Sequence, residues 1–172
     1  EKIKKIRDMW KGKLVLKGAE SVHDVEKAYQ LGLDGVIISN HGGRQVDVGQ
    51  ATVDSLKNIA PLYKDKLTIM MDSGIRGGAD VARVMATGAD FSFMGRTFMY
   101  GVSALGKKGG NHTIAMLKQQ LTQIMEQLSC GQIKDFQKFS ETLLNKLKQE
   151  YVLPIINEKI KSKPKIFAID KE

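Results

Sequence analysis

A histidine and an arginine lie three positions apart in the stretch SNHGGRQ, residues 39–45, with two glycines between them. Histidine titrates near neutral pH and accepts a proton readily, whereas a guanidinium binds a carboxylate through two parallel hydrogen bonds. Gly42 and Gly43 have no side chain and leave space for a ligand between His41 and Arg44. An isolated histidine is more often a satisfied core residue, but the neighbouring arginine favours a base beside a carboxylate-binding group.

Two later segments combine glycine and arginine as phosphate-binding loops do. The first is DSGIRGG, residues 72–78, and the second is the pair Gly95-Arg96. Glycines let backbone N–H groups approach a ligand closely, and the start of a following helix favours an anion. GIRGG alone is equally consistent with a plain turn, but two such segments in succession favour a phosphate site.

Lys17 ends a run that predicts a buried strand, where an ammonium group needs a partner. One interpretation is a structural ion pair with a carboxylate such as Asp72. The other is a cation held against a ligand that becomes anionic during a reaction. The sequence leaves both interpretations open.

Each of these polar clusters follows a short apolar run that predicts a β-strand. Continuous apolar runs are typical of strands buried on both faces of a parallel sheet. The four runs span residues 14–16, 35–38, 67–71 and 91–94.

Helical patterns follow the predicted strands. Ser21 and Asp24 resemble a capping box at the start of the first helix, and Thr52 is expected to cap the second. A third helix is expected over residues 79–87, and a long fourth helix over residues 111–129. The order strand then helix therefore occurs four times.

An α/β chain of repeated strand–helix units closes into a barrel or opens into a doubly wound sheet. In a barrel the carboxyl ends of successive strands form one rim, where functional residues gather. All four polar clusters would lie on that rim. Barrels commonly bind phosphate beside the loops after strands 7 and 8, which the last two loops become if this chain is the second half of one.

The composition argues against several classes of protein. The 172 residues are enough for one domain, and 42% hydrophobic and 27% charged residues are ordinary for a globular protein. The apolar runs are too short for a transmembrane helix, and the charged start lacks the apolar core of a signal peptide. The single cysteine excludes an internal disulfide, and no Cys/His cluster has zinc-site spacing. We therefore expect no metal and a reducing, intracellular compartment.

The net charge of +8 is concentrated in residues 2–13 and 134–171. Such an excess attracts the phosphates of nucleic acids. No RNA-binding signature or interleaved aromatic pattern accompanies it, so we expect solvated surface and no nucleic-acid partner.

Together the motifs resemble the C-terminal half of the FMN-dependent α-hydroxy-acid dehydrogenase/oxidase family, which includes L-lactate dehydrogenases and oxidases, glycolate oxidase and mandelate dehydrogenase. The resemblance runs from about Ile6 to Cys130, through LVLKG, DGVIISNHGGRQVD and MDSGIRGGADVARVMATGADFSFMGR. Other FMN or phosphate-binding barrels, such as IMP dehydrogenase, share the phosphate loops and lack SNHGGRQ. The resemblance implies a (β/α)8 TIM barrel, of which this chain covers the last four βα units as a half-barrel.

The resemblance also implies a role for each motif residue. His41 would be the catalytic base, Arg44 would hold the substrate carboxylate, and Asp72 would orient and charge-pair His41. Lys17 would stabilise the reduced, anionic flavin near its N1/O2 edge, and Ser39 would hydrogen-bond FMN, so that Lys17 and Asp72 serve both catalysis and cofactor binding. The ribityl and phosphate groups of FMN would be bound by Ser73, Gly74, Ile75, Arg76, Gly95 and Arg96. The implied reaction oxidises an L-2-hydroxy acid, with L-lactate the leading choice, to the 2-oxo acid.

Barrels of this kind typically need eight strands and about 250 residues, whereas this sequence supplies four strands. The family's active-site tyrosines come from the earlier half, and the tyrosines here fall on predicted helices or in the tail. We therefore expect a fragment or one piece of a split enzyme, whose sheet edges are covered by an N-terminal half-barrel or by a second copy of the chain. The alternative is a non-catalytic half-barrel that binds FMN or phosphate and acts in assembly.

Residues 1–130 are expected to form the half-barrel and residues 131–172 a basic helical tail. Phe136, Phe139, Leu143 and Leu147 predict an amphipathic helix there, which we expect to pack against the barrel or a neighbouring subunit rather than a membrane. The expected location is cytoplasmic, either free or peripheral to the inner face of the membrane.

Overall fold

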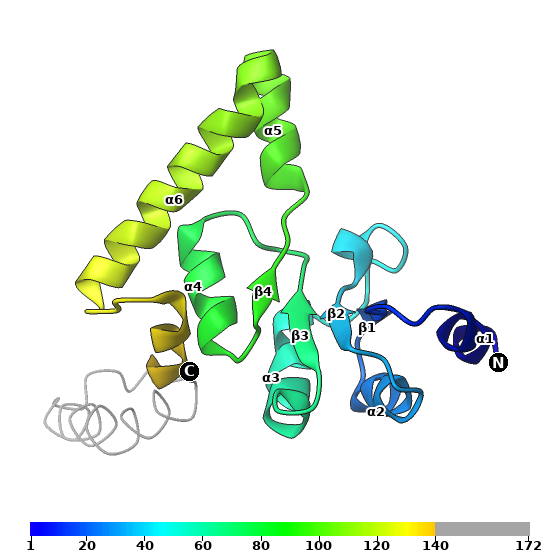
Figure 1. The fold of residues 1–172 in the computed structure, drawn as a ribbon. Helices are drawn as coiled ribbons and strands as arrows, with labels where there is room; N and C mark the ends of the chain where they lie inside the picture. Colours follow the sequence, from blue (N-terminus) through cyan, green and yellow to red (C-terminus); the bar gives the residue numbers. More distant parts are fainter. Residues whose placement is uncertain (140–172) are drawn as a thin grey trace, which may run out of the picture.

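A computed structural model of the chain describes residues 1–139, and its centre is a parallel four-stranded sheet in the order β1-β2-β3-β4 (Figure 1). The strands are β1 (Val15–Ala19), β2 (Gly35–Ile38), β3 (Thr68–Met71) and β4 (Phe91–Ser92). All three strand pairs are parallel. The four predicted strands are therefore confirmed, although β1 runs on to Ala19 and β4 stops at Ser92.

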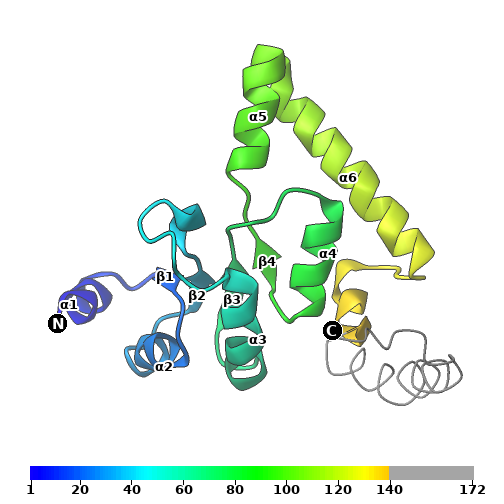
Figure 2. The ribbon, with the colours of Figure 1, turned by 180° about the vertical axis from the view of Figure 1, so that it is seen from behind.

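Helices follow the strands, and the four predicted helices are present near their predicted positions, as α2, α3, α4 and α6. The helices are α1 (Lys2–Met9), α2 (Val22–Gln30), α3 (Thr52–Tyr63), α4 (Gly78–Ala86), α5 (Arg96–Leu105) and α6 (Gly109–Gln127). Three short 3₁₀ segments complete the described residues: η1 (His41–Gly43), η2 (Gly106–Lys108) and η3 (Ile133–Phe139). Figures 1 and 2 show α2 and α3 below the strands, η1 and the start of α5 above them, and α5 and α6 as a projecting hairpin.

The main core lies between the sheet and the helices α2, α3 and α4. Val36 and Ile38 of β2 and Ile69 of β3 are fully buried there, and Val25 and Leu56 contribute from α2 and α3. Removing such apolar area from water stabilises the fold by about 25 cal/mol per Å². This packing fixes the strands and, through them, the loops at their carboxyl ends.

The opposite face of the sheet is much less covered. The register places Lys17, Ile37, Met70 and Phe91 in one row across the four strands. Phe91 is 56% exposed, and Phe93, two residues further on, is 41% exposed. Large apolar side chains on an open sheet face indicate a surface that another element covers in a complete fold.

Two expectations about helix starts had different outcomes. Ser21 caps α2 as predicted, because its Oγ accepts a hydrogen bond from the N–H of Asp24. The expectation that Thr52 caps α3 is wrong: Ala51 is the N-cap, and the Thr52 hydroxyl donates instead to the carbonyl of Asp72. Thr52 thus connects α3 to the loop after β3.

The region after β4 holds two helices where the sequence predicted one. The long helix expected over residues 111–129 is present as α6, but α5 precedes it and was not predicted. The two helices cross closely, since a Cβ on Gly101 or Gly109 would collide with the facing helix. Glycine at both positions therefore permits the hairpin.

The described part of the tail packs against α4. Phe136 in η3 is 1% exposed and contacts Ala82 and Met85 of α4. Phe139 joins the same cluster, whereas Leu143 and Leu147 lie outside the described residues. The predicted packing is confirmed for η3, which is a 3₁₀ segment and not an α-helix; the boundary at residue 130 stays a prediction.

Asp34 joins α1 to the start of the sheet and should make the fold sensitive to acid. Hydrogen bonds from Lys13, from the N–H of Leu14 and from Arg7, with the positive charge of Lys13, lower the pKa of its carboxyl to about 2. Because the folded pKa lies below the unfolded value of about 3.9, the carboxylate stabilises the fold fully above that value. This stability is lost as the pH falls through about 2.

We therefore expect Asp34→Asn to be less stable than the wild type at neutral pH and to show a smaller further loss on acidification. Urea unfolding between neutral pH and about pH 2 measures this. Asp65→Asn, which alters an exposed aspartate, is the control. Equal acid sensitivity of Asp34→Asn and wild type would contradict the prediction.

Candidate active site

One cavity of about 300 Å³ lies at the carboxyl ends of the strands and collects the charged residues that the motifs singled out. Its lining comes from Lys17 of β1 and from residues that follow β2, β3 and β4, as expected for a shared rim. The predicted residues that line it are Lys17, His41, Arg44, Asp72, Ser73, Gly74, Ile75, Arg76, Gly95 and Arg96. Of the predicted site residues only Ser39 is absent from the lining, and it lies directly behind Lys17 through a hydrogen bond.

Lys17, Ser39 and Asp72 form a connected polar network at the base of the cavity. Lys17 Nζ lies 2.6 Å from Asp72 Oδ2 and donates to Ser39 Oγ at 2.7 Å. Ser39 is fully buried, and its Oγ also accepts from the N–H of His41 at 3.2 Å. The structural ion pair that the sequence left open for Lys17 is therefore present, and it lies inside the cavity.

Asp72 keeps its negative charge in spite of partial burial. Burial raises its pKa, but hydrogen bonds from Lys17, Ser39 and Ser73 and the charge of Lys17 together lower the pKa below the ordinary value. Ser73 Oγ donates to Asp72 Oδ1 at 2.7 Å. The resemblance implied that Asp72 pairs with His41; in this geometry its direct partners are Lys17 and serine hydroxyls.

The loop that holds His41 has an unusual backbone. His41, Gly42 and Gly43 all have positive φ, at 55°, 70° and 73°. Left-handed conformations cost an ordinary L-residue about 1–2 kcal/mol, so the loop needs support from its surroundings. Asn40 supplies part of it: its side chain accepts from the N–H of Gly42 and donates to the carbonyl of Gln50.

Gly18 makes room for the imidazole of His41. It interrupts the pairing of β1 with β2, has a φ of 94°, and a Cβ at this position would lie 3.3 Å from Cε1 of His41. His41 and Arg44 are both exposed and line the same cavity. The base and the carboxylate-binding group predicted from SNHGGRQ are thus brought to one cavity.

The two glycine loops leave open space where a phosphate would need it. Among residues 1–139, apart from the adjacent residues in the chain, nothing lies within 4 Å of a Cβ built on Gly74 or on Gly95. Arg76 and Arg96 both line the cavity beside these glycines. Two guanidinium groups beside unobstructed backbone are a suitable arrangement for a phosphate.

The start of α4 contributes less to anion binding than its sequence suggested. Asp80 Oδ2 accepts from the N–H groups of Arg76 and Gly77, and Gln120 Oε1 accepts from the N–H of Gly78. These donors, which a free helix start offers to anions, are therefore used within the protein. The Arg76 side chain and the residues before it are the groups of this loop that are left available to an anion.

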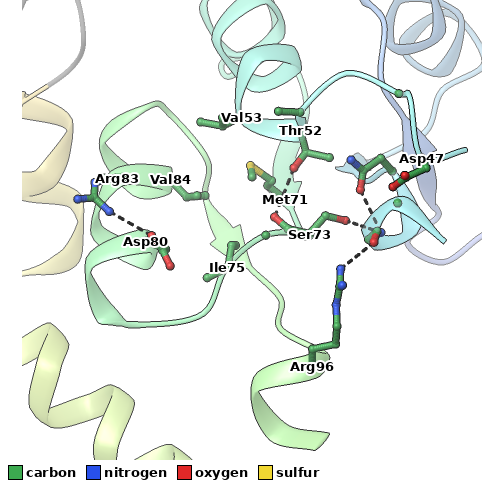
Figure 3. A pocket seen from close by; sticks show the side chains of 16 residues that line it. Asp47, Thr52, Val53, Met71, Ser73, Ile75, Asp80, Arg83, Val84 and Arg96 are labelled. Atoms are coloured by element: carbon green, nitrogen blue, oxygen red, sulfur yellow. Dashed lines mark hydrogen bonds and ion pairs between the residues drawn. The ribbon is translucent and has the colours of Figure 1, made fainter. Parts of the chain in front are cut away.

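The structure adds residues that the sequence reasoning missed. Asn40 before a pair of glycines is a typical turn signal that could have been recognised, whereas Phe93, Met94 and Met99 line the cavity only because β4 and α5 meet there. A second cavity of about 460 Å³ lies next to the first, and Arg96 lines both (Figure 3). Among residues 1–139 no group of three or more His, Cys, Asp or Glu side chains is placed to hold a metal ion.

Comparison with known proteins identifies the family. The family model for FMN-dependent dehydrogenases matches residues 1–143. The chain belongs to the FMN-dependent α-hydroxy-acid dehydrogenase family. This confirms the resemblance carried by SNHGGRQ and DSGIRGG, and the family uses FMN.

Individual relatives agree with this membership. The chain is 38% identical over 144 residues to an L-lactate dehydrogenase of Bartonella tribocorum, and 43% identical over 117 residues to an FMN-dependent alpha-hydroxy acid dehydrogenase of Schizosaccharomyces pombe. These matches cover 79% and 68% of this chain. They cover only 38% and 29% of the relatives, so the chain spans about a third of the length of the curated proteins it matches.

Solved structures of the family contain the same architecture. A soluble mutant of the membrane-associated (S)-mandelate dehydrogenase from Pseudomonas putida superposes with a TM-score of 0.74 at 33% identity, over 78% of this chain and 38% of that one. A mandelate oxidase superposes with a TM-score of 0.75 at 29% identity, over 79% of this chain and 41% of that one. The four parallel strands thus match part of a TIM-barrel FMN dehydrogenase. Within residues 1–139, none of the helices combines the length and apolar character needed to cross a membrane.

Proposed function

We propose that this chain supplies the last four βα units of an FMN-dependent L-2-hydroxy-acid dehydrogenase or oxidase. Its reaction converts the L-2-hydroxy acid, with L-lactate as the leading candidate, to the 2-oxo acid. The observation that carries the proposal is the cavity of about 300 Å³ at the strand ends, because it gathers a histidine, five further charged side chains of the motifs and two open glycines. Relatives named L-lactate dehydrogenase support the choice of substrate.

The residues present fit FMN at its phosphate end. Arg76 and Arg96 provide the positive charge, and Gly74 and Gly95 leave the space for close approach of the backbone. Ser73 and Ile75 complete the proposed ribityl and phosphate contacts. Bound there, FMN supplies an acceptor for the two electrons that leave the substrate.

The remaining residues act on the substrate and on charge. Arg44 binds the substrate carboxylate through its guanidinium, and His41 takes up the proton that the substrate loses. Asp72 lines the same cavity as His41, and its carboxylate pairs with Lys17 at 2.6 Å. Lys17 and Ser39, joined by a 2.7 Å hydrogen bond, provide a cation and a hydroxyl toward the flavin.

The open face of the sheet indicates that the working site includes more protein. Phe91 and Phe93 stand exposed on the face that lines the interior of a closed barrel. We propose that an N-terminal half-barrel or a second copy of the chain covers this face. Sedimentation of a stable, non-aggregating monomer would count against this part of the proposal.

Anaerobic reduction of the flavin tests the proposed reaction. We expect L-lactate to bleach the visible absorbance of FMN mixed with the chain, supplemented if needed by the N-terminal segment of a relative, whereas D-lactate leaves the absorbance unchanged. Bleaching by neither L-lactate nor any other L-2-hydroxy acid in both preparations would contradict the proposal. FMN binding without bleaching would favour the second candidate, a non-catalytic half-barrel. The uncovered sheet face and the partial length of the chain support that candidate.

A further inference from the structure

We propose that Arg96 is a positioning residue: its guanidinium holds the carbonyl of Gly42 in the loop that carries His41 and Arg44. The order of that loop thereby depends on whether an anion occupies the glycine loops of residues 72–78 and 95–96, called here the anion-binding loops. The identity of those loops rests on the proposed function. The link itself rests on contacts among described residues and concerns how the loop is held rather than which ligand is oxidised.

The backbone of Gly42 is hydrogen-bonded to residues that follow two different strands. Arg96 Nη2 donates to the Gly42 carbonyl at 2.7 Å, while the N–H of Gly42 donates to Ser73 Oγ at 3.1 Å. Figure 3 shows the Arg96 side chain extending from the start of α5 toward this loop and Ser73 reaching it from the loop after β3. Residues after β3 and β4 thus hold a residue adjacent to His41.

The contact with Arg96 requires glycine at position 42 for steric reasons. A Cβ on Gly42 would lie only 2.6 Å from Nη2 of Arg96, and the φ of 70° already disfavours other residues. The guanidinium therefore occupies the space that a side chain at position 42 would take. His41 and Gly43 also have positive φ, so the outside contacts support the loop in addition to its own backbone hydrogen bond from the N–H of Gly43 to the carbonyl of Asn40.

Arg96 is able to serve the loop and an anion together. A guanidinium has five N–H donors in a fixed planar fork, and the Gly42 carbonyl engages one nitrogen of that fork. The same side chain lines the cavity with Arg76 and the open glycines. An anion held between the two arginines fixes the orientation of the fork, and this strengthens the bond to Gly42. A lysine has one ammonium group and cannot bridge two acceptors in a defined plane.

Linkage makes the effect measurable without flavin chemistry. If an anion tightens the loop, then loop order and anion affinity change by the same factor. Couplings of this kind commonly amount to about fivefold or more. The N–H groups of Gly42 and Gly43 are suitable reporters because both are hydrogen-bonded. The N–H of Gly42 donates to the side chains of Ser73 and Asn40, and the N–H of Gly43 donates to the Asn40 carbonyl.

The test is amide hydrogen exchange of the full 172-residue chain with and without inorganic phosphate. We expect phosphate to slow exchange at Gly42 and Gly43 of the wild type by about fivefold or more. Arg96→Lys should exchange faster at both amides without phosphate and should lose the response to it, and Arg96→Gln should do the same. The matched control is Arg76→Lys, which weakens phosphate binding but should retain slow exchange at both amides once phosphate is saturating.

Unchanged exchange at Gly42 and Gly43 in both Arg96 variants would overturn the positioning role. An equal response to phosphate in wild type and Arg96→Lys, or no response in the wild type, would overturn the link to the anion site. Failure of the proposed function looks different: FMN and L-2-hydroxy acids would then be inert while the phosphate response at Gly42 persists.

Discussion

His41→Gln should remove oxidation of the 2-hydroxy acid while leaving FMN affinity unchanged. Glutamine fills a similar volume beside Gly18 but does not accept a proton near neutral pH, so the loss should be about 10²–10⁴-fold in kcat, the range typical of a general base. The proposed phosphate contacts come from the loops after β3 and β4, and Ser39 bonds only the backbone N–H of residue 41, which glutamine retains. Anaerobic flavin reduction and FMN titration of the same variant measure the two quantities separately.

His112→Gln is the control for this variant, because His112 is exposed on α6 and does not line the cavity. It should behave as the wild type in both measurements. Full activity of His41→Gln would remove His41 from the mechanism. A parallel loss of FMN binding would instead show that the variant disturbs the loop and not only the base.

Asp72→Asn should lower the free energy of unfolding at neutral pH by about 2 kcal/mol, the amount typical of hydrogen bonds to a charged group. The substitution removes the partner of Lys17, 2.6 Å away, and the charged acceptor of the Ser73 hydroxyl. Because the pKa of Asp72 is lowered in the fold, its contribution is present above the unfolded pKa of about 3.9 and disappears as the pH falls below it. Urea unfolding at neutral and acidic pH measures both effects.

The difference between wild type and Asp72→Asn should therefore shrink on acidification. Asp8→Asn, at an exposed position in α1, provides a comparison without such partners and should show no comparable loss at neutral pH. If Asp72→Asn unfolds at the same urea concentration as the wild type, the network of Lys17, Ser39 and Asp72 does not support the fold as argued.

The strands and the rim residues were predictable because they depend on local sequence. Short apolar runs followed by glycine mark buried parallel strands, and the positions after them fall on one rim whatever the side-chain details. This reasoning correctly brought Lys17, His41 and Asp72 to one cavity. The sequence left the ion pair between Lys17 and Asp72 as one of two interpretations, and the structure contains that ion pair.

Other features depend on contacts between distant segments and were not predictable. The sequence of α5 contains Gly101 in its middle, which lowers helix propensity, and close packing against Gly109 and Thr113 of α6 compensates. Thr52 looked like a helix cap, but a carbonyl 20 residues away accepts its hydroxyl hydrogen bond. The contact of Arg96 with Gly42 spans 54 positions and has no local signal.

An FMN titration of the purified chain, compared directly with riboflavin and run with sedimentation on the same sample, tests the central claim most directly. Riboflavin lacks the phosphate that Arg76, Arg96 and the open glycines are proposed to bind. The account predicts saturable binding of one FMN per chain, much weaker binding of riboflavin, and competition by inorganic phosphate. Failure of FMN to bind, or binding of riboflavin as tightly as FMN, would contradict the claim that these loops form the phosphate site.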